Sequence, residues 1–274
     1  MNKILAVSGG IDSMVLMHIY RNDPNAIIAH FDHGIRECSN LDAEFVCRMA
    51  RAYGRPFFAE RANLGPNASE ELARNERYKF LKRLCAEHDA KLYTAHHADD
   101  LAESVIINLY RGTGWRGLTP LNNPAICRPL LSWDKKKIYR YASKNSIVFR
   151  ADSTNTENKY LRNRIRTMLA EHPELSKTLK GQFANNYQIR AEIEQLESEL
   201  IQDSPRAKRS IYQNLDDACA SELLYYQLKL WHISITRPQL LRALDAVRHY
   251  QPGKKLSLNR SQFLAVSKHT FYLS

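Results

Sequence analysis

The chain has 274 residues, 44% of them hydrophobic, and a formal net charge of +11 at pH 7. This length allows one large domain and a smaller one. No apolar run approaches the ~20 residues needed to cross a bilayer, and the N-terminus lacks a signal-peptide pattern, so we expect a cytoplasmic protein with no membrane partner. The five cysteines are odd in number and include no Cys-x-x-Cys pair, which argues against a disulfide framework or a cysteine metal site.

The positive charge lies downstream of the first half of the chain. Residues 1–127 carry 15 basic and 15 acidic residues, whereas residues 128–168 carry 11 basic and 3 acidic residues. Residues 174–274 carry 14 basic and 10 acidic residues. A basic block is typical of proteins that bind a polyanion, most often nucleic acid; a basic surface without a partner is the alternative.

The first 110 residues alternate between strand and helix patterns. Short apolar runs predict strands over 3–7, 26–31, 56–58 and 92–95. Apolar residues at helical spacing predict helices over 14–20, 41–53, 70–85 and 99–110, with Ser69 as an N-cap. This alternation predicts an α/β fold with a Rossmann-like parallel sheet covered on both faces, and ligands in such folds bind at the carboxyl ends of the strands.

The pattern becomes mainly helical after about residue 170. One long helix is predicted over 179–201, and the run Asp203–Arg206 breaks it. Two shorter helices are predicted over 218–231 and 238–247, and alternation within 254–274 fits a pair of short strands. We therefore expect a first domain over 1–175, a long linker helix over 176–205 and a small, mainly helical domain over 206–274.

The strongest candidate site is the segment Ser8–Ser13 (SGGIDS), which follows the first strand. Gly9 and Gly10 let backbone N–H groups approach an anion, and the two serine hydroxyls and the helix N-terminus add further attraction. A Walker loop would carry a lysine, which this segment lacks. Asp12 would repel a phosphate unless a divalent cation lay between them, so Mg²⁺ is expected. The alternative is a strand–helix turn that binds nothing.

Polar residues also end the second predicted strand, in the run His30–Arg36. Asp32 lies at a carboxyl end of the sheet, where it could meet the ribose or base of a nucleotide, and Arg36 could reach a phosphate. A strand end capped by its own side chains is the alternative.

The segment Thr94–Ser104 follows the fourth strand and is rich in His and acidic residues. Asp100 and Glu103 are three residues apart and share a helix face, where two carboxylates can hold an ammonium group or a metal. Helix capping by acids in a first turn is the alternative. His96 and His97 could act on a phosphate or as acid–base groups, but adjacent histidines cannot form the i, i+4 zinc pair.

Two further segments combine arginines with loop or helix patterns. The run Arg111–Leu118 contains three glycines, Trp115 and Arg116, which suits a loop that closes over a phosphate or a base. In the segment 152–166, a helix would place Arg162 and Arg166 on one face and Arg164 on another. That arrangement could divide the arginines between ATP phosphates and an RNA backbone, with a surface loop and a solvated basic helix as the respective alternatives.

Taken in order, these motifs resemble the tRNA(Ile)-lysidine synthetase family of the PP-loop ATP pyrophosphatase superfamily. SGGIDS is similar to the loop that defines the superfamily. The resemblance to the family extends from Lys3 to about Leu169, and residues 206–274 resemble its small substrate domain only loosely. The other shared motifs are HFDHGIR, Glu70–Arg74 with Arg77-Tyr78, TAHHADDLAES, RGTGWRGL, Arg128–Leu131 and Asp152–Arg166.

The resemblance implies a two-step reaction with ATP. The O2 atom of the wobble cytidine in an isoleucine tRNA with a CAU anticodon attacks the α-phosphate of ATP, and pyrophosphate leaves. The ε-amine of free L-lysine then attacks C2 of the adenylated base, AMP leaves, and the product is lysidine. Longer members carry a further C-terminal domain that grips the tRNA acceptor end, which we do not expect in this chain.

The resemblance also implies roles for individual residues. It makes residues 1–175 the PP-loop ATP-binding catalytic domain and residues 206–274 the tRNA substrate domain. Catalysis would involve Asp12, which would hold Mg²⁺, together with Arg74 or Arg77 and His97 at the α-phosphate, while Asp100 and Glu103 would bind the ammonium group of lysine. ATP would be bound by Ser8, Gly9, Gly10, Ile11, Asp12, Ser13, Asp32 and Arg36, and tRNA by Arg111, Arg116, Arg162, Arg164 and Arg166.

Other functions remain open at this point. Another PP-loop tRNA-modifying enzyme, such as a 2-thiocytidine thiolase, would generally need paired cysteines or an iron–sulfur cluster, and the chain has no Cys-x-x-Cys. A non-catalytic RNA-binding protein would explain the basic block but not the intact loop with its acidic pair. A glutamine-dependent amidotransferase would need a glutaminase domain, and no such domain is recognisable. The oligomeric state is open, a homodimer included.

Overall fold

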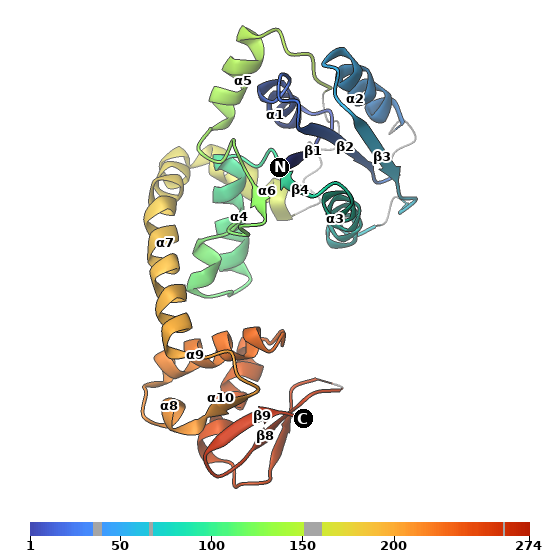
Figure 1. The fold of residues 1–274 in the computed structure, drawn as a ribbon. Coiled ribbons are helices and arrows are strands. Elements are labelled where there is room, and N and C mark those ends of the chain that lie inside the picture. The colour runs from blue at the N-terminus through green and yellow to red at the C-terminus, as the bar shows by residue number, and fades with distance from the viewer. Residues whose placement is uncertain (35–39, 66–67, 151–160, 260) are drawn as a thin grey trace. The chain divides into compact units, whose positions relative to one another are not determined.

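The computed structural model describes residues 1–34, 40–65, 68–150, 161–259 and 261–274. These residues form two compact units, Met1–Tyr187 and Gln188–Ser274 (Figure 1). Arg36 and residues 152–160 of the predicted segment 152–166 lie outside the described residues.

The first unit contains a five-stranded parallel sheet in the order β3-β2-β1-β4-β5. The prediction of an α/β fold with a Rossmann-like parallel sheet is thereby confirmed. The short strand β5 has no counterpart among the predicted elements. The strands are β1 (Asn2–Ala6), β2 (Ala26–Asp32), β3 (Phe57–Arg61), β4 (Ala90–Tyr93) and β5 (Ile126–Cys127).

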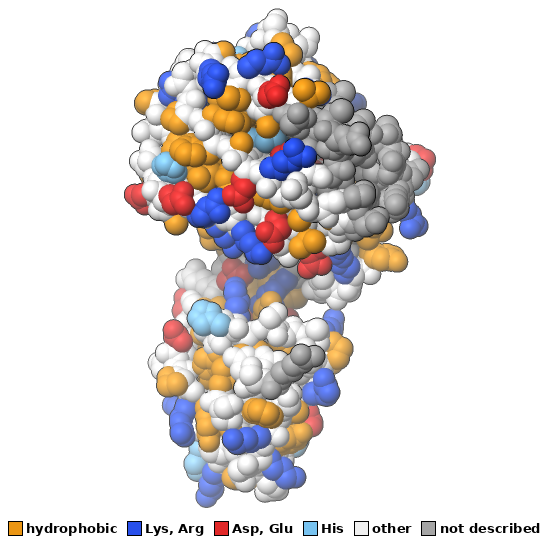
Figure 2. Space-filling view, turned by 90° about the vertical axis from the view of Figure 1, so that its right-hand side faces the viewer, with side chains coloured by type: hydrophobic (Ala, Val, Ile, Leu, Met, Phe, Trp, Pro, Cys, Tyr) orange, Lys and Arg blue, Asp and Glu red, His pale blue; other side chains and the backbone are white. Residues whose placement is uncertain are grey.

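Helices cover both faces of this sheet and continue beyond it. Figure 2 shows basic and acidic side chains interspersed over the visible face of the first unit, as expected for solvated helix surfaces. The helices are α1 (Ile11–Ile19), α2 (Asn40–Ala52), α3 (Glu70–Glu87), α4 (Ala98–Tyr110), the 3₁₀ turn η1 (Trp115–Leu118), α5 (Lys135–Lys144), α6 (Leu161–Glu171) and α7 (Pro173–Leu200), which passes the unit boundary.

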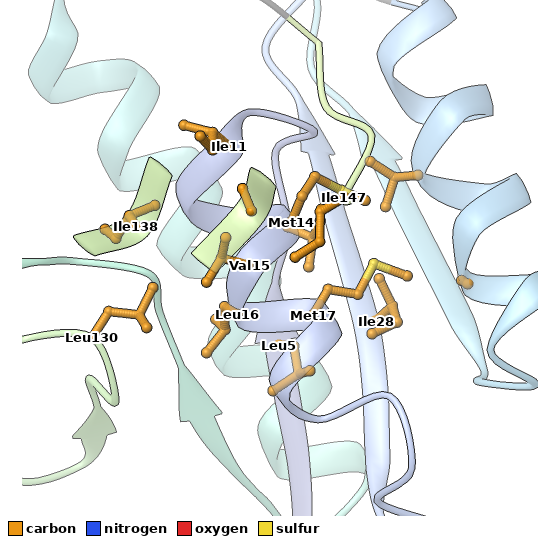
Figure 3. Packing of buried hydrophobic residues seen from close by; sticks show 14 of the residues in the cluster. Leu5, Ile11, Met14, Val15, Leu16, Met17, Ile28, Leu130, Ile138 and Ile147 are labelled. Atoms are coloured by element: carbon orange, nitrogen blue, oxygen red, sulfur yellow. The ribbon is translucent and has the colours of Figure 1, made fainter. Parts of the chain in front are cut away.

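Alternation along the strands divides the core of the first unit into two layers. Leu5 and Ile28 belong to the layer that includes α1, α2 and α5, whereas Ile4 and Ile27 belong to the layer formed with α3. Helix α1 is buried along most of its length, because Leu130, Ile138 and Ile147 pack around it in addition to the sheet (Figure 3). This packing attaches the chain segment after β5 to the helix that follows the SGGIDS loop.

Helices α4, α6 and α7 meet in a separate apolar cluster of the first unit. Ala102 and Ile107 of α4 pack with Ile165 and Leu169 of α6, and Leu179 of α7 packs against them. The cluster brings the arginine-bearing face of α6 against the acidic first turns of α4.

The described residues of the second unit form a four-stranded sheet, the C-terminal part of α7 and the helices α8, α9 and α10. The strand order is β6-β9-β8-β7, with antiparallel pairing throughout. The tail was expected to form two strands, and this number is wrong: three strands form there and a fourth is contributed by residues 206–208. The elements are β6 (Arg206–Lys208), α8 (Arg209–Gln213), α9 (Asp217–Leu230), α10 (Arg237–His249), β7 (Lys255–Ser257), β8 (Phe263–Val266) and β9 (Thr270–Leu273).

A buried arginine joins the helices and strands of the second unit. Arg209 donates hydrogen bonds to the carbonyl oxygens of Val247, Arg248, Tyr250 and Ser267. These acceptors include the last carbonyls of α10, which have no partner within the helix. Within the described ranges, no helix is long and apolar enough to cross a membrane.

Candidate functional site

The candidate site lies at the carboxyl ends of β1 and β4. From β1 the chain continues to β2 and β3, which lie on one side of β1 in the sheet. The next strand, β4, pairs with β1 on the other side. This change of direction in the strand order is the position where open α/β sheets bind ligands. The SGGIDS loop follows β1, and the two histidines His96 and His97 follow β4.

The side chain of Ser13 holds the SGGIDS loop in a closed turn. Its hydroxyl accepts hydrogen bonds from the backbone N–H groups of Ser8 and Gly9, at 3.1 and 3.2 Å, and donates to the carbonyl of Gly10 at 2.8 Å. Gly9 has a φ of +95°, which side chains disfavour, so glycine is required there for the turn. Gly10 is the N-cap of α1 and has no side chain to cover the first N–H groups of the helix.

The helix begins at Ile11, three residues earlier than the sequence pattern predicted. Ile11 faces the core, whereas Asp12 lies in the first turn with its side chain 30% exposed. The free N-terminal N–H groups of a helix and its dipole attract an anion. The loop therefore has the local geometry of a phosphate site with a carboxylate at its mouth.

Lys135 supplies a lysine to this loop from a distant helix. Its Nζ atom lies 2.6 and 2.7 Å from the two carboxylate oxygens of Asp12. Lys135 is the first residue of α5, and its backbone N–H donates to Asp99 of α4 at 2.7 Å. Asp99 also accepts from Lys180 of α7. The loop sequence has no lysine of its own, but the fold places Lys135 of α5 next to it.

His97 is buried beside three carboxylates. Its Nδ1 atom accepts a hydrogen bond from the N–H of Asp99 at 3.2 Å, and its Nε2 atom lies 3.5 Å from Asp100 and 3.7 Å from Asp12. Burial lowers the pKa of His97, but the contact of its ring with the side-chain carboxylate of Asp99, which lies 3.4 Å from Nδ1, and the charges of Asp100 and Asp12 outweigh this effect, and the net pKa is raised. His97 therefore lies beside the loop through Asp12, and the surrounding carboxylates favour the protonated form of its ring.

His96 faces the opposite environment, a cluster of arginines. Burial lowers the pKa of His96 to about 3, together with the charges of Arg77, Arg128, Arg74 and Arg162. Its Nδ1 atom is 2.8 Å from the hydroxyl of Thr94. These four arginines come from α3, from the segment after β5 and from α6, so the fold concentrates positive charge around a neutral imidazole. Such a cluster suits an anion with several negative oxygens.

The arginines of this cluster are held from several directions. The guanidinium carbons of Arg74 and Arg77 lie 5.0 and 5.5 Å from the ring centre of Tyr78. Arg128 donates to the carbonyls of Asn123 and Ile126, and its buried Nε atom has no hydrogen-bond partner among the described residues. From the sequence, Arg128 was expected only as the first residue of the basic block over 128–168 that binds a polyanion.

Asp100 and Glu103 lie on one face of α4 but have different partners. Asp100 accepts a hydrogen bond from the N–H of His97 at 2.9 Å and completes a capping box. Glu103 is only 2% exposed, and Arg166 reaches its two oxygens at 2.8 and 3.2 Å. Arg162 approaches the same carboxylate at 3.8 Å. The shared face of Arg162 and Arg166 is as predicted, but it faces Glu103; their predicted contact with tRNA stays a prediction, as does the ammonium site.

The remaining predicted residues lie at the carboxyl end of β2 or on the surface. Asp32 is buried and accepts from the N–H of Gly34 at 2.8 Å, with Arg61 3.4 Å away. Arg116 stacks on Trp115 with 4.6 Å to the ring centre, whereas Arg111 and Arg164 are exposed. These positions neither confirm nor contradict the predicted contacts with ATP and tRNA.

The donor set near the loop is compatible with Mg²⁺. In the part of the chain that the structure describes, no three His, Cys, Asp or Glu side chains are grouped to hold a metal. Mg²⁺ is commonly held by one or two carboxylates with substrate phosphates and water. Asp12 is a partly exposed carboxylate of this kind.

Sequence reasoning missed Lys135, Asp99 and Lys180. One signal was present: α5 begins with three lysines, at the end of a helix where the dipole disfavours cations. A run of cations at that position indicates a neighbouring negative group. The identity of that group, Asp12 in the case of Lys135, depends on the packing of α5 against α1.

Comparison with known proteins places the chain in a family. Residues 2–173 match the PP-loop domain family. The tRNA(Ile)-lysidine synthase of Thermotoga maritima is 39% identical over 177 residues, which is 60% of this chain and 43% of that protein. The tRNA(Ile)-lysidine synthase of Enterococcus faecalis is 32% identical over 219 residues, 72% of this chain and 47% of that protein. The chain thus spans less than half of the length of these relatives.

A solved structure supports the same fold. The U34-tRNA thiolase NcsA from Methanococcus maripaludis, with its [4Fe-4S] cluster, superposes with a TM-score of 0.57 at 18% identity, covering 70% of this chain and 73% of that chain. This likeness concerns the fold alone. The PP-loop match covers the sheet, the SGGIDS loop, the two histidines and α6. The chain belongs to the PP-loop domain family.

Proposed function

We propose that the protein uses ATP to join free L-lysine to C2 of the wobble cytidine of an isoleucine tRNA with a CAU anticodon. Two relatives named tRNA(Ile)-lysidine synthase, at 39% and 32% identity, support this reaction. The observation that carries the nucleotide half of the proposal is the SGGIDS loop, closed by Ser13 at the switch point of the sheet. Lysidine, AMP and pyrophosphate are the products.

In the first step, the cytidine O2 atom attacks the α-phosphate and the bond to the β-phosphate breaks. The N–H groups of the loop and the start of α1 bind the pyrophosphate oxygens. Lys135 lies at the same mouth, paired with Asp12 until a phosphate competes for its ammonium group. Asp12 would hold Mg²⁺, which supplies further neutralisation of the phosphate charge when bound.

The arginines around His96 stabilise charge on the α-phosphate in that step. Arg74 and Arg77 are held against Tyr78, and Arg128 adds a guanidinium from the segment after β5. A neutral His96 adds no further positive charge to repel these arginines, and it leaves the phosphate to them.

In the second step, the ε-amine of lysine attacks C2, the C2–O2 bond breaks and AMP leaves with that oxygen, and the proton that the amine loses as the C–N bond forms passes to the departing phosphate or to water. Asp100 is the more accessible member of the acidic pair, with a side chain 20% exposed. Glu103 is buried under Arg166 and orients that arginine. We therefore assign the ammonium contact first to Asp100, with Glu103 behind it.

The test is incorporation of labelled lysine into RNA. The protein is mixed with ATP, labelled L-lysine and isoleucine tRNA bearing a CAU anticodon, and a tRNA differing only by uridine at the wobble position serves as the control. We expect ATP-dependent label in the first tRNA, with one AMP formed per lysine. ATP turnover without label in either tRNA would overturn lysidine formation.

The same reaction run with a labelled sulfur donor tests the alternative of a thiolase. The free cysteines Cys47, Cys85, Cys127 and Cys219 form no disulfide within the described residues. Burial raises the pKa of the Cys85 thiol, which makes it a poor nucleophile at neutral pH. Sulfur transferred to the cytidine, in place of lysine, would support that alternative.

A further inference from the structure

A second basic cavity lies on the first unit, outside the SGGIDS loop. Its volume is about 710 Å³, and its lining comes from α5, from the segment before α5, from α7 and from Ala98 at the start of α4. Lys136, Lys137 and Arg140 line it together with Lys180 and Phe183. None of the residues Ser8–Ser13 belongs to the lining. This cavity is in the size range of sites that bind a nucleotide or a similar group.

The charges that line the cavity are unbalanced. Asp134 is its one acidic lining residue, and the carboxylate of Asp134 already accepts the N–H of Lys137 as the N-cap of α5. Lys180 pairs with Asp99. Lys136, Lys137 and Arg140 form no ion pair with any carboxylate in the described residues. Three cations thus face one cavity without an acidic partner, in contrast to the mixed charges over the face drawn in Figure 2.

The position of these cations on the helix is unfavourable for α5 itself. The helix has lysines at 135, 136 and 137, in its first turn, where the dipole favours acids. Lys135 forms an ion pair with Asp12, whereas Lys136 and Lys137 form no ion pair with a carboxylate of the described residues. A negative ligand in the cavity would reverse the sign of this interaction, because it would face both the N-terminus of α5 and the lysines.

Aromatic side chains accompany the cations. Phe183 is the aromatic residue of the lining, and the Nζ atom of Lys137 also lies 4.5 Å from the ring centre of Trp133, which packs against the core and is not a lining residue. Cations next to aromatic faces suit nucleic acid, because the cations contact phosphates while bases stack on the rings. An acidic peptide would use the charges but leave the aromatic surface without a planar partner.

We propose that this cavity binds the sugar–phosphate backbone of the RNA substrate, with Lys136 and Arg140 contacting phosphates. Lys136 and Arg140 are four residues apart on α5 and lie on one face of the helix. That this RNA is isoleucine tRNA rests on the proposed function. That the ligand is an RNA backbone rests on the residues that line the cavity. The cavity shares no lining residue with the SGGIDS loop, although Lys180, which pairs with Asp99, belongs to both the candidate site and the cavity.

The test compares two double variants that lose the same charge. K136Q/R140Q removes two cations from the cavity, and R51Q/K82Q removes two exposed cations from α2 and α3. Binding of fluorescein-labelled isoleucine tRNA with a CAU anticodon is measured by anisotropy over a range of KCl concentrations. We expect K136Q/R140Q to bind about tenfold more weakly near 0.1 M salt and to lose between one and two units of the slope of log K against log salt. R51Q/K82Q should change affinity less than about threefold.

Each outcome separates this surface from the proposed reaction. Equal tRNA affinity in the two double variants would overturn the cavity as an RNA site, even if lysidine is formed. Selective loss of tRNA binding in K136Q/R140Q, in a protein that incorporates no lysine, would support the surface and overturn the reaction. Preferential loss of poly-glutamate binding, with tRNA binding retained, would overturn RNA in favour of an acidic protein. ATP binding and the melting curve of each variant confirm that the fold is intact.

Discussion

The ammonium group of Lys135 bridges both carboxylate oxygens of Asp12, although the two residues lie 123 positions apart in the chain. Each side chain is about one-third exposed, so solvent weakens the pair and it contributes little to stability. Its position at the mouth of the SGGIDS loop matters more. A phosphate that enters the loop meets a lysine there, as in a Walker loop, but the lysine is delivered by a separate helix.

Replacing Lys135 should weaken ATP binding. Lys135→Met removes a positive charge from the phosphate site and leaves Asp12 to repel the ligand, so we expect an affinity for Mg²⁺–ATP at least about tenfold lower, or ~1.4 kcal/mol. Isothermal titration calorimetry measures this. Lys136→Met is the matched control, since Lys136 faces the other cavity and has no contact with Asp12. Equal ATP affinity in the two variants would remove Lys135 from the phosphate site.

Acid should destabilise the first unit through His96. The pKa of His96 is lowered to about 3, so the unfolded chain binds a proton below pH 6.5 that the folded chain refuses. The contribution of the neutral His96 to the free energy of unfolding is therefore fully present above pH 6.5 and is lost as the pH falls toward 3. Between pH 7 and pH 5 this linkage costs about 2 kcal/mol of the free energy of unfolding.

The measurement is urea unfolding at pH 7 and pH 5. His96→Asn preserves a polar group near Thr94 but does not titrate, so its free energy of unfolding should fall less between the two pH values than that of the parent. His172→Asn changes an exposed histidine and should follow the parent. If the free energy of unfolding of the parent and of His96→Asn changed equally between pH 7 and pH 5, a neutral, buried His96 would be contradicted.

Removing Arg166 should destabilise the α4–α6 contact. Glu103 is 2% exposed and its oxygens are held by Arg166, so Arg166→Met leaves a buried carboxylate with only the longer contact to Arg162. We expect a loss of about 3 kcal/mol in the free energy of unfolding. Arg164→Met, on the exposed side of the same helix, should change it by less than about 0.5 kcal/mol.

A double-mutant cycle shows whether the loss comes from the pair. Glu103→Gln combined with Arg166→Met removes the buried charge along with its partner, and part of the lost stability should return. If the effects of the two substitutions simply add, the contact between Glu103 and Arg166 contributes no coupling energy.

Local sequence patterns determined much of the fold and the phosphate loop. The continuous apolar runs in β1 and β2 are enough to predict a sheet buried on both faces, because successive side chains point to opposite sides. Ser69 as the N-cap of α3 follows from the same kind of local rule, and its hydroxyl accepts from the N–H of Leu72. The glycine at position 9 is read locally too, because a positive φ is a property of one residue.

The partners of the site residues were decided only by the tertiary structure. Which lysine reaches Asp12, why the pKa of His96 is lowered while that of His97 is raised, and which arginine covers Glu103 all depend on elements that are distant in sequence. Periodicity shows that a helix has a buried face, but it does not show which helix packs there. The strand order 3-2-1-4-5 and the packing of α5 on α1 and of α6 on α4 set those distances, and electrostatic interactions follow distance and burial rather than sequence order.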